Sequence, residues 1–259
     1  MKIVVLVKHV PDPSTPWQFA PDRTLDREAA QSRLSELDEY AVEQAVSLVE
    51  KGLPATITFL TMGPAPSADS LRKALAMGGD DAVHVCDDAV HGSDALATSL
   101  VLARAVERIG FDLVVCGMAS TDGEMSVVPA MLADRLGVPQ LTFAADLAVT
   151  DGTVTGVRDS EVDSVRLEAA LPAVVSVTDQ TGEPRYPSFR AILASKKKPV
   201  ATWSLADLGV EPASVGLAGA ATRVRTVSAE PPRQVGDVIT DEGDAAGRIA
   251  DFLVARNLL

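Results

Sequence analysis

The sequence predicts an α/β fold in which helices flank a parallel β-sheet. Short, continuous apolar runs recur between residues 2 and 116, as expected for strands that are buried on both faces. Between these runs, apolar residues recur at helical spacing. Hydrophobic residues make up 47% of the chain and charged residues only 23%, a composition typical of a well-packed globular protein.

The N-terminal part begins with a strand, Lys2–Lys8, which leads into a loop over residues 9–34 that contains four prolines. Loops of this length are usually functional or contact a partner. A helix follows from Ser35 to Glu50. Ser35 and Asp38 fit a capping box at its start, and a glycine two residues after Glu50 fits its C-terminal stop.

The middle of the chain continues the alternation of strands and helices. The predicted elements are a strand at Ala55–Thr61, a helix at Ser67–Met77, a strand at Ala82–Val85, a helix that Ser93 caps and that runs to Ile109, a strand at Asp112–Cys116, and a helix at Ser126–Leu136. Four strands joined by helical crossovers of this length predict βαβ units and therefore a parallel sheet.

The pattern changes after residue 138. The run Ala145–Val157, interrupted by Asp151-Gly152, predicts an antiparallel hairpin appended to the sheet. Residues 165–177 return to strand character, and residues 183–198 form an exposed arm with a short apolar helix and three lysines. We therefore expect one α/β domain over residues 1–198. Residues 199–259 contain four prolines and little hydrophobic periodicity, and they are expected to form an extended C-terminal arm that packs on a partner subunit.

Composition excludes several classes of function. The formal net charge of −13 repels phosphate backbones and argues against nucleic-acid binding. Cys86 and Cys116 lie in apolar runs typical of buried small hydrophobes, and the three histidines show no ligand spacing, so no metal site is expected. The N-terminal apolar run is too short for a signal peptide, and no run is long enough to span a membrane. These features favour a cytoplasmic protein that is not embedded in a membrane.

Two loops are candidates for a ligand site. Ligands of open parallel sheets bind beyond the carboxyl ends of the strands, where the winding direction reverses. The loops that follow the first and fourth strands, residues 7–12 and 117–126, meet this condition. In the second loop, small and hydroxyl residues let the backbone approach an anion, and the dipole of the following helix attracts a phosphate. A well-capped loop without a ligand is the alternative, and the spacing leaves both open.

Other nucleotide and catalytic motifs are absent from the sequence. It contains no G-x-x-x-x-G-K-[ST] and no G-x-G-x-x-G after the first strand, and no catalytic triad can be placed. Asp122 and Glu124 form an acidic pair in the second loop. Such residues more often bind ribose hydroxyls or cap helices than act as an acid and a base.

Five ordered segments carry a resemblance to a known family. They are VLVKHVPD at Val5–Asp12, LDEYAVEQAV at Leu37–Val46, MGPAPSADSLRKALAMGGDDAVHV at Met62–Val85, DLVVCGMASTDGEMSVVPAMLADRLGVPQLTFA at Asp112–Ala144, and the stretch from LPAVV to KKK at Leu171–Lys198. With them, the chain from Met1 to about Val210 resembles the β subunit of electron transfer flavoproteins. The fold that this implies is Rossmann-like, of the adenine-nucleotide α-hydrolase-like type.

The resemblance also implies cofactors, partners and site residues. FAD would be held mainly by an α subunit in a heterodimer, and a structural AMP by this subunit. The implied AMP contacts are Leu6, Ser35, Asp38, Met62, Gly117, Ser120, Thr121, Asp122, Gly123, Glu124, Met125, Ser126, Val127 and Val128. The implied docking residues for flavin dehydrogenases, such as acyl-CoA dehydrogenases, are Tyr186, Phe189, Ile192, Leu193, Lys196, Lys197 and Lys198. The complex would be an electron carrier for fatty acid β-oxidation rather than an enzyme, with an electron transfer flavoprotein–quinone oxidoreductase as acceptor.

Two segments depart from the pattern of the family. Its helix start often reads Asn-Pro-x-Asp, whereas this chain has Ser35-Glu36-Leu37-Asp38. Its phosphate loop often ends in Gln-x-Gly or Thr-Gly, whereas this chain has Ser126-Val127-Val128-Pro129. The departures remove a side-chain donor and some backbone freedom, which leaves backbone N–H groups and Ser126 to hold AMP.

Three alternatives remain beside the main interpretation. The first is an electron-bifurcating β subunit that binds a second FAD and oxidises NADH. The second is a stand-alone adenine-nucleotide-binding protein of the universal-stress type, against which the exposed arm and the C-terminal segment argue. The third is an ATP-using ligase of the same fold, whose phosphate motif is missing.

Overall fold

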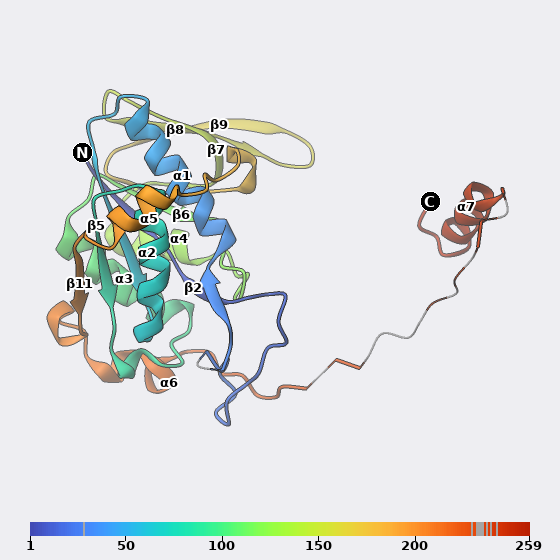
Figure 1. The fold of residues 1–259 in the computed structure, drawn as a ribbon, viewed down its shortest axis with the longest axis horizontal. Helices are drawn as coiled ribbons and strands as arrows, with labels where there is room; N and C mark the ends of the chain where they lie inside the picture. The colour runs from blue at the N-terminus through green and yellow to red at the C-terminus, as the bar shows by residue number, and fades with distance from the viewer. Residues whose placement is uncertain (28, 229, 232–235, 237, 239, 242) are drawn as a thin grey trace. The chain divides into compact units, whose positions relative to one another are not determined.

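The computed structural model describes residues 1–259 except residues 28, 229, 232–235, 237, 239 and 242. The chain divides into two compact units, Met1–Arg225 and Thr226–Leu259. All strands named below belong to the first unit (Figure 1).

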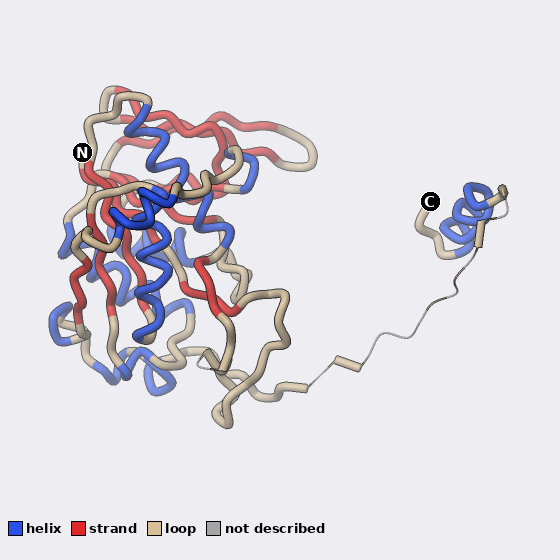
Figure 2. The backbone as a smooth tube through the Cα atoms, in the orientation of Figure 1, coloured by secondary structure: helices blue, strands red, loops and turns tan. Residues whose placement is uncertain are grey.

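The first unit alternates strands and helices in its N-terminal half and then adds further strands. In chain order the elements are β1 (Lys2–Leu6), β2 (His9–Pro11), β3 (Ser32–Leu34), α1 (Glu36–Glu50), β4 (Thr56–Met62), α2 (Ala68–Met77), β5 (Asp81–Val85), α3 (Ala95–Ile109), β6 (Leu113–Gly117), α4 (Val128–Leu136), β7 (Gln140–Thr150), β8 (Thr153–Asp159), β9 (Ser164–Ala170), β10 (Ala173–Val177), α5 (Phe189–Ser195), β11 (Val200–Trp203) and α6 (Gly216–Gly219). The second unit contains α7 (Ala245–Ala255). The predicted α/β fold is confirmed, with strands and helices interleaved in the tube drawing (Figure 2).

A nine-stranded sheet organises the fold, in the order β11-β5-β4-β1-β6-β10-β7-β8-β9. Neighbouring strands from β11 to β7 are parallel, and β7, β8 and β9 pair antiparallel. The predicted hairpin is thus confirmed and gains a third strand. Asp151 and Gly152 form its turn with φ angles of 50° and 75°, the left-handed conformation that tight hairpin turns require. Part of the long N-terminal loop forms the separate antiparallel pair β2–β3.

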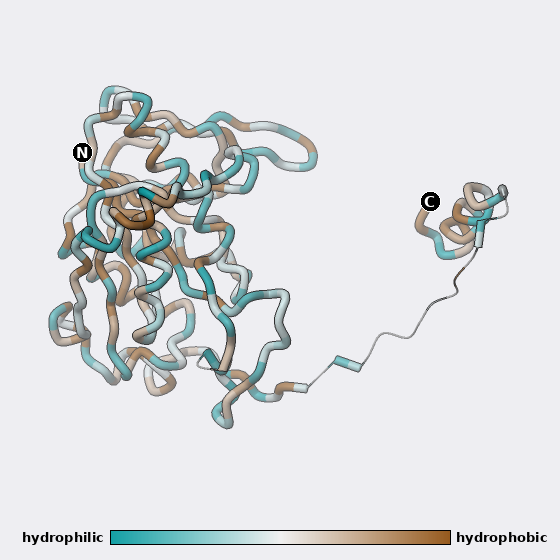
Figure 3. Tube along the Cα trace, viewed as in Figure 1, coloured by the Kyte–Doolittle hydropathy of each residue, from teal (hydrophilic) through white to brown (hydrophobic). Residues whose placement is uncertain are grey.

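Helices cover both faces of the parallel sheet. Alternate residues of each strand point to opposite faces, so Ile3 and Val5 of β1 pack with the helices α1 and α2, whereas Val4 packs with α3 and α4. Figure 3 shows hydrophobic residues concentrated along the central strands. The scarcity of aromatic residues suits this arrangement, because valine, alanine and leucine fill the thin layer between helix and sheet.

Three predicted helix starts are corrected by the structure. The capping box at α1 is wrong: Ser35 occupies the N-cap position without a side-chain cap hydrogen bond. The N-cap of α3 is Asp94, whose carboxylate accepts a hydrogen bond from the Ala97 N–H at 3.0 Å, rather than Ser93. Helix α4 starts at Val128, because Ser126 has a φ of 56° and cannot belong to a right-handed helix.

The division of the chain differs from the predicted boundary at residue 198. Val200–Trp203 adds the edge strand β11 parallel to β5, with Val200 opposite Ala82. The leucines and valines at positions 205, 208, 210 and 215 are buried in the core on the α3 side of the sheet. The first compact unit therefore extends to Arg225. These apolar residues lie in turns, so their contribution to the core leaves no periodic pattern.

Helix α7 exposes its apolar side chains. Ile249, Phe252 and Val254 are exposed, and the guanidinium of Arg256 lies 4.9 Å from the centroid of the Phe252 ring. Packing of this segment on an α subunit stays a prediction.

Candidate functional site

The reversal point of the sheet lies between β1 and β6. The chain passes from β1 to β4 and β5 on one side and then crosses to β6 on the other side of β1. The segments that leave the carboxyl ends of these two strands are residues 7–12, which include the short strand β2, and the loop of residues 118–127. They correspond to the predicted loops 7–12 and 117–126. Side-chain contacts join these two segments.

Asp122 connects the two loops through ion pairs. Its carboxylate lies 2.7 Å from the Lys8 Nζ and 2.6 Å from an Nη of Arg27, and only 3% of its side chain is exposed. The Lys8 Nζ also donates a hydrogen bond to the Ser120 Oγ at 3.2 Å. Burial acts to raise the pKa of Asp122, but the charges of Lys8 and Arg27 outweigh it and lower the pKa to about 2. Two cationic side chains therefore lie beside one ionised carboxylate at the carboxyl ends of β1 and β6.

Asp38, near the start of α1, contacts the backbone of Lys8. Its buried carboxylate accepts a hydrogen bond from the Lys8 backbone N–H at 2.8 Å. Burial raises the pKa of Asp38 to about 7, against hydrogen bonds from the backbone of Lys8 and Gly117 and the Lys8 charge, which favour the ionised form. Gly117 approaches Asp38 so closely that a Cβ would lie 2.6 Å from the Asp38 Oδ1 and 2.7 Å from the Leu37 carbonyl oxygen. The fold therefore requires a glycine where β6 ends.

We expect Asp38 to make the stability of the protein depend on pH. The pKa of about 7 in the folded chain lies above the value of about 4 for an unfolded aspartate. The folded state therefore binds the proton more tightly, and the free energy of unfolding should fall as pH rises from about 4 through 7. The loss should be on the order of 3 kcal/mol. The free energies of unfolding of the wild type and of Asp38→Asn are measured in urea at several pH values. The stability of the wild type relative to the variant should fall as the pH rises.

The outcome of this comparison discriminates between two effects. If the free energies of unfolding of wild type and Asp38→Asn differ by the same amount from pH 4 to pH 8, the pKa of Asp38 is not raised in the folded protein. If the wild type instead becomes more stable relative to Asp38→Asn as the pH rises, the backbone N–H groups of Lys8 and Gly117 keep Asp38 ionised despite its burial.

The loop from residue 118 to residue 127 presents backbone donors. Glu124 and Ser126 adopt positive φ angles of 49° and 56°, and the Gly123 N–H donates to the Ser120 Oγ at 3.3 Å. Within the described part of the chain, the N–H groups of residues 125–127 have no hydrogen-bond acceptor. Such N–H groups ahead of a helix suit an anion. Pro129, which lacks an N–H, is accommodated at the second position of α4.

The buried hydroxyl of Ser35 is a second feature that fits a ligand. Among the described residues its Oγ has no hydrogen-bond partner, and buried hydroxyl groups are seldom left without one. The Ser35 backbone N–H donates to the Lys8 carbonyl at 2.9 Å, which fixes the start of α1 against the end of β1. The unpaired Ser35 hydroxyl and the unpaired backbone N–H groups of residues 125–127 are donors of the kind that suit the hydroxyls and phosphate of a nucleotide.

The structure gathers the predicted nucleotide contacts at one edge of the sheet. Leu6, Met62 and Gly117 end β1, β4 and β6, Ser35 and Asp38 start α1, and Ser120, Thr121, Asp122, Gly123, Glu124, Met125, Ser126, Val127 and Val128 run from the loop into α4. Leu6 and Met62 pack in the core on the α3 side. Whether these residues contact a nucleotide stays a prediction.

Sequence reasoning missed Lys8 and Arg27 as site residues. Lys8 lies two residues after the end of a buried strand at the reversal point, a position that could have drawn attention to its charge. Arg27 lies in the long proline-containing loop, and nothing in the local pattern marks it. Its contact with Asp122 joins residues 95 positions apart.

The predicted docking residues separate into two groups. Tyr186 and Phe189 are 97% and 77% exposed, and Ile192, Leu193, Lys196 and Lys197 are exposed as well. Lys198 differs, because its Nζ donates hydrogen bonds to the carbonyl oxygens of Leu75, Gly78 and Gly79 at 2.9, 3.3 and 2.7 Å. Its ammonium group thus binds the C-terminal end of α2.

Other kinds of site are not evident in the described residues. There, no group of three or more His, Cys, Asp or Glu side chains is arranged to hold a metal ion. None of the helices in the described ranges has the length and apolar character needed to cross a membrane. Cys116 is buried, and burial raises the pKa of its thiol, so it is not a reactive thiolate.

The fold and the arrangement of the two loops define an α/β protein with a doubly wound sheet whose winding reverses between β1 and β6. The family model described as electron transfer flavoprotein domain matches residues 22–208. The chain is 46% identical over 263 aligned residues to the electron transfer flavoprotein subunit beta of Mycobacterium leprae, covering 99% of both chains. It therefore belongs to the electron transfer flavoprotein family.

Two further relatives show the breadth of this similarity. The electron transfer flavoprotein subunit beta of Mycobacterium tuberculosis is 44% identical, again over 99% of both chains. The caffeyl-CoA reductase-Etf complex subunit CarD of Acetobacterium woodii is 30% identical over 99% of this chain and 97% of its own.

Proposed function

We propose that this chain is the β subunit of a heterodimeric electron transfer flavoprotein. The observation that carries the proposal is the 46% identity to a named β subunit over 99% of both chains. In this role the chain carries electrons together with an α subunit that holds most of the FAD. It makes and breaks no bonds in a substrate. We expect the heterodimer to act in the cytoplasm.

The reversal point of the sheet is proposed to bind AMP. The Ser35 Oγ and the N–H groups of residues 125–127 would bind the nucleotide. AMP would thereby provide hydrogen-bond partners for groups that lack them in the protein alone. The local charge is compatible with a phosphate, because Lys8 and Arg27 offset the acidic side chains of Asp122 and Glu124. The raised pKa of about 7 also leaves Asp38 largely protonated below neutral pH. AMP supplies no chemistry to electron transfer here and acts as a structural ligand.

The exposed face of α5 is proposed to dock flavin dehydrogenases, such as acyl-CoA dehydrogenases. Phe189, Ile192 and Leu193 expose apolar surface on one short helix, and aromatic anchors concentrate binding energy at interfaces. Lys196 and Lys197 add positive charge to an otherwise acidic chain, which would steer acidic partner surfaces. Electrons would then leave through FAD to a quinone oxidoreductase.

The nucleotide content of the complex tests the proposal. Co-expression of this chain with its α subunit should give a yellow heterodimer, whereas the chain alone should be colourless. Chromatography of the small molecules released by denaturation should detect one FAD and one AMP per heterodimer. Absorbance at flavin and adenine wavelengths provides the ratio.

Other nucleotide ratios would contradict parts of the proposal. Two FAD per heterodimer would favour the bifurcating alternative, in which this subunit binds the second FAD and NADH. One FAD without AMP would show that the Ser126–Pro129 segment does not retain the nucleotide. A yellow, FAD-loaded chain without its partner would contradict the heterodimer itself.

A further inference from the structure

The proposed docking helix is too short to be stable by itself. Helix α5 spans seven residues, Phe189–Ser195, and isolated helices of fewer than about 12 residues are marginal in water. Its own start has one capping hydrogen bond, from the Ala191 N–H to the Ser188 Oγ at 3.2 Å. The contacts that keep this exposed element in place must therefore come from elsewhere in the chain.

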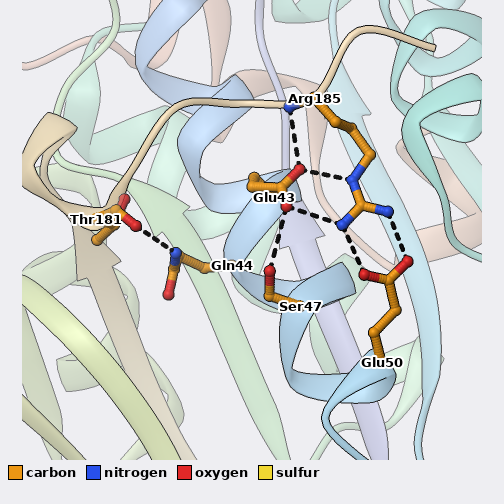
Figure 4. A network of polar contacts seen from close by, with 6 residues as sticks. All are labelled: Glu43, Gln44, Ser47, Glu50, Thr181 and Arg185. Carbon is orange, nitrogen blue, oxygen red and sulfur yellow. Dashed lines mark hydrogen bonds and ion pairs between the residues drawn. The ribbon is translucent and has the colours of Figure 1, made fainter.

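Arg185 anchors the segment that leads into α5 (Figure 4). Its Nε and one Nη donate to the Glu43 carboxylate at 2.7 and 2.8 Å, and its two Nη donate to the Glu50 carboxylate at 2.6 and 2.8 Å. The Arg185 backbone N–H donates to Glu43 as well, at 3.1 Å. Nearby, the Gln44 Nε2 donates to the Thr181 carbonyl oxygen at 2.9 Å. We call the contacts of Arg185 with Glu43 and Glu50 the Arg185 clamp.

The geometry of the Arg185 clamp matches a guanidinium group. Glu43 and Glu50 lie seven residues apart, about two turns, on the same face of α1. A single planar guanidinium makes a bidentate contact with each, which an ammonium cannot do. Arg185 lowers the pKa of Glu50 and, against the effect of burial, that of Glu43, so both are carboxylates at neutral pH.

The other end of α5 is fixed to α2. One Nη of Arg72 donates to the carbonyl oxygens of Ser195 and Lys198, both at 2.8 Å. The Lys198 Nζ donates in turn to the last carbonyl groups of α2 and to those just after it, where a cation is favoured by the helix dipole. The chain is thus fixed to α1 just before α5 and to α2 at the end of α5, while the apolar face of α5 stays exposed.

We propose that Arg185 is a positioning residue for partner docking, which holds α5 in its binding conformation before the partner arrives. This inference rests on the proposed docking function. Fixing a binding element in advance reduces the entropy that is lost on association. Arg185 itself needs no contact with the dehydrogenase for this effect, because it acts through the placement of Phe189.

A double-mutant cycle on the αβ complex tests the proposal. The variants are Arg185→Met, Phe189→Ala and the double substitution, and Arg104→Met serves as control because Arg104 pairs with Glu107 on the surface of α3. The rate of flavoprotein reduction by an acyl-CoA dehydrogenase is measured against flavoprotein concentration. Arg185→Met should raise KM about fivefold, equivalent to about 1 kcal/mol, with kcat and FAD content unchanged. Arg185→Lys should restore only part of the affinity.

The coupling between the two residues decides the result. If Arg185 acts through α5, its loss should have little further effect once Phe189 is truncated, so the two effects should not add. Additive effects, or an unchanged KM in Arg185→Met while Phe189→Ala raises KM, would overturn the positioning role and leave the docking function in place. An unchanged KM in Phe189→Ala would refute docking by α5 and the inference with it.

Discussion

Replacing Phe189 by alanine is expected to weaken electron transfer from a dehydrogenase at least tenfold. The side chain is 77% exposed, and burial of a phenylalanine in a partner pocket contributes roughly 1.5–3 kcal/mol. A tenfold loss corresponds to about 1.4 kcal/mol. Because the ring makes little contact with the core, the melting temperature and the FAD and AMP contents should barely change. Dehydrogenase-coupled reduction at varied flavoprotein concentration measures the effect.

A matched pair of leucines controls for the loss of exposed apolar surface. Leu193 on α5 is 48% exposed and Leu96 on α3 is 47% exposed. Leu193→Ala should raise KM, and Leu96→Ala should not. An unchanged rate in Phe189→Ala would place this residue outside the docking surface, whereas lost FAD would place it at the interface with the α subunit.

Replacing Gly117 by alanine is expected to destabilise the protein by about 2–3 kcal/mol, in the range of an overpacked core. The added Cβ would lie within 2.8 Å of atoms of Asp38 and Leu37, and one of these is a backbone carbonyl oxygen that cannot rotate away. The start of α1 would have to move from the end of β6. The AMP content should therefore fall together with stability, as measured by denaturant unfolding and nucleotide release.

Gly247→Ala provides the control for this substitution. Gly247 lies within α7, and a Cβ there meets no atom within 4 Å, so the change should be neutral or slightly stabilising. A Gly117→Ala protein with wild-type stability would show that α1 and β6 can separate without cost. Normal stability with lost AMP would instead indicate a local effect on the nucleotide.

Much of the fold could be predicted from the sequence, because strands and helices impose local periodicity. The predicted strand Lys2–Lys8 appears as β1 (Lys2–Leu6), and the predicted helix Ser35–Glu50 appears as α1 (Glu36–Glu50), with shifts of two residues and one residue. The two loops at the reversal point follow from the strand order that βαβ connections impose. Glycines stop α2 and α3 at Gly78 and Gly110. Gly110 has a φ of 76°, which few other residues tolerate, whereas a Cβ at Gly78 would clash with a methyl group of Val46.

Helix caps were harder to predict than helices. Ser35 and Asp38 have the right spacing for a capping box, but the Asp38 carboxylate bonds to the Lys8 backbone instead. Lys198 likewise belongs to a row of three lysines, of which it alone binds the carbonyl groups at the end of α2. In both cases a neighbour distant in sequence competes for the polar group, and local spacing contains no information about it.

The sequence by itself determined the alternation of elements and the exposed segment around Phe189, and it predicted the two loops at the reversal point of the sheet as a ligand site. Only the tertiary structure decided that Lys8 and Arg27 share Asp122, and that Arg185 spans 142 positions to reach Glu43. Periodicity records which side of an element faces the core, since burial selects apolar residues at regular spacing. The partner of a charged side chain depends instead on how loops and helices meet in space, because one carboxylate can pair with any cation that the fold brings within a few ångströms.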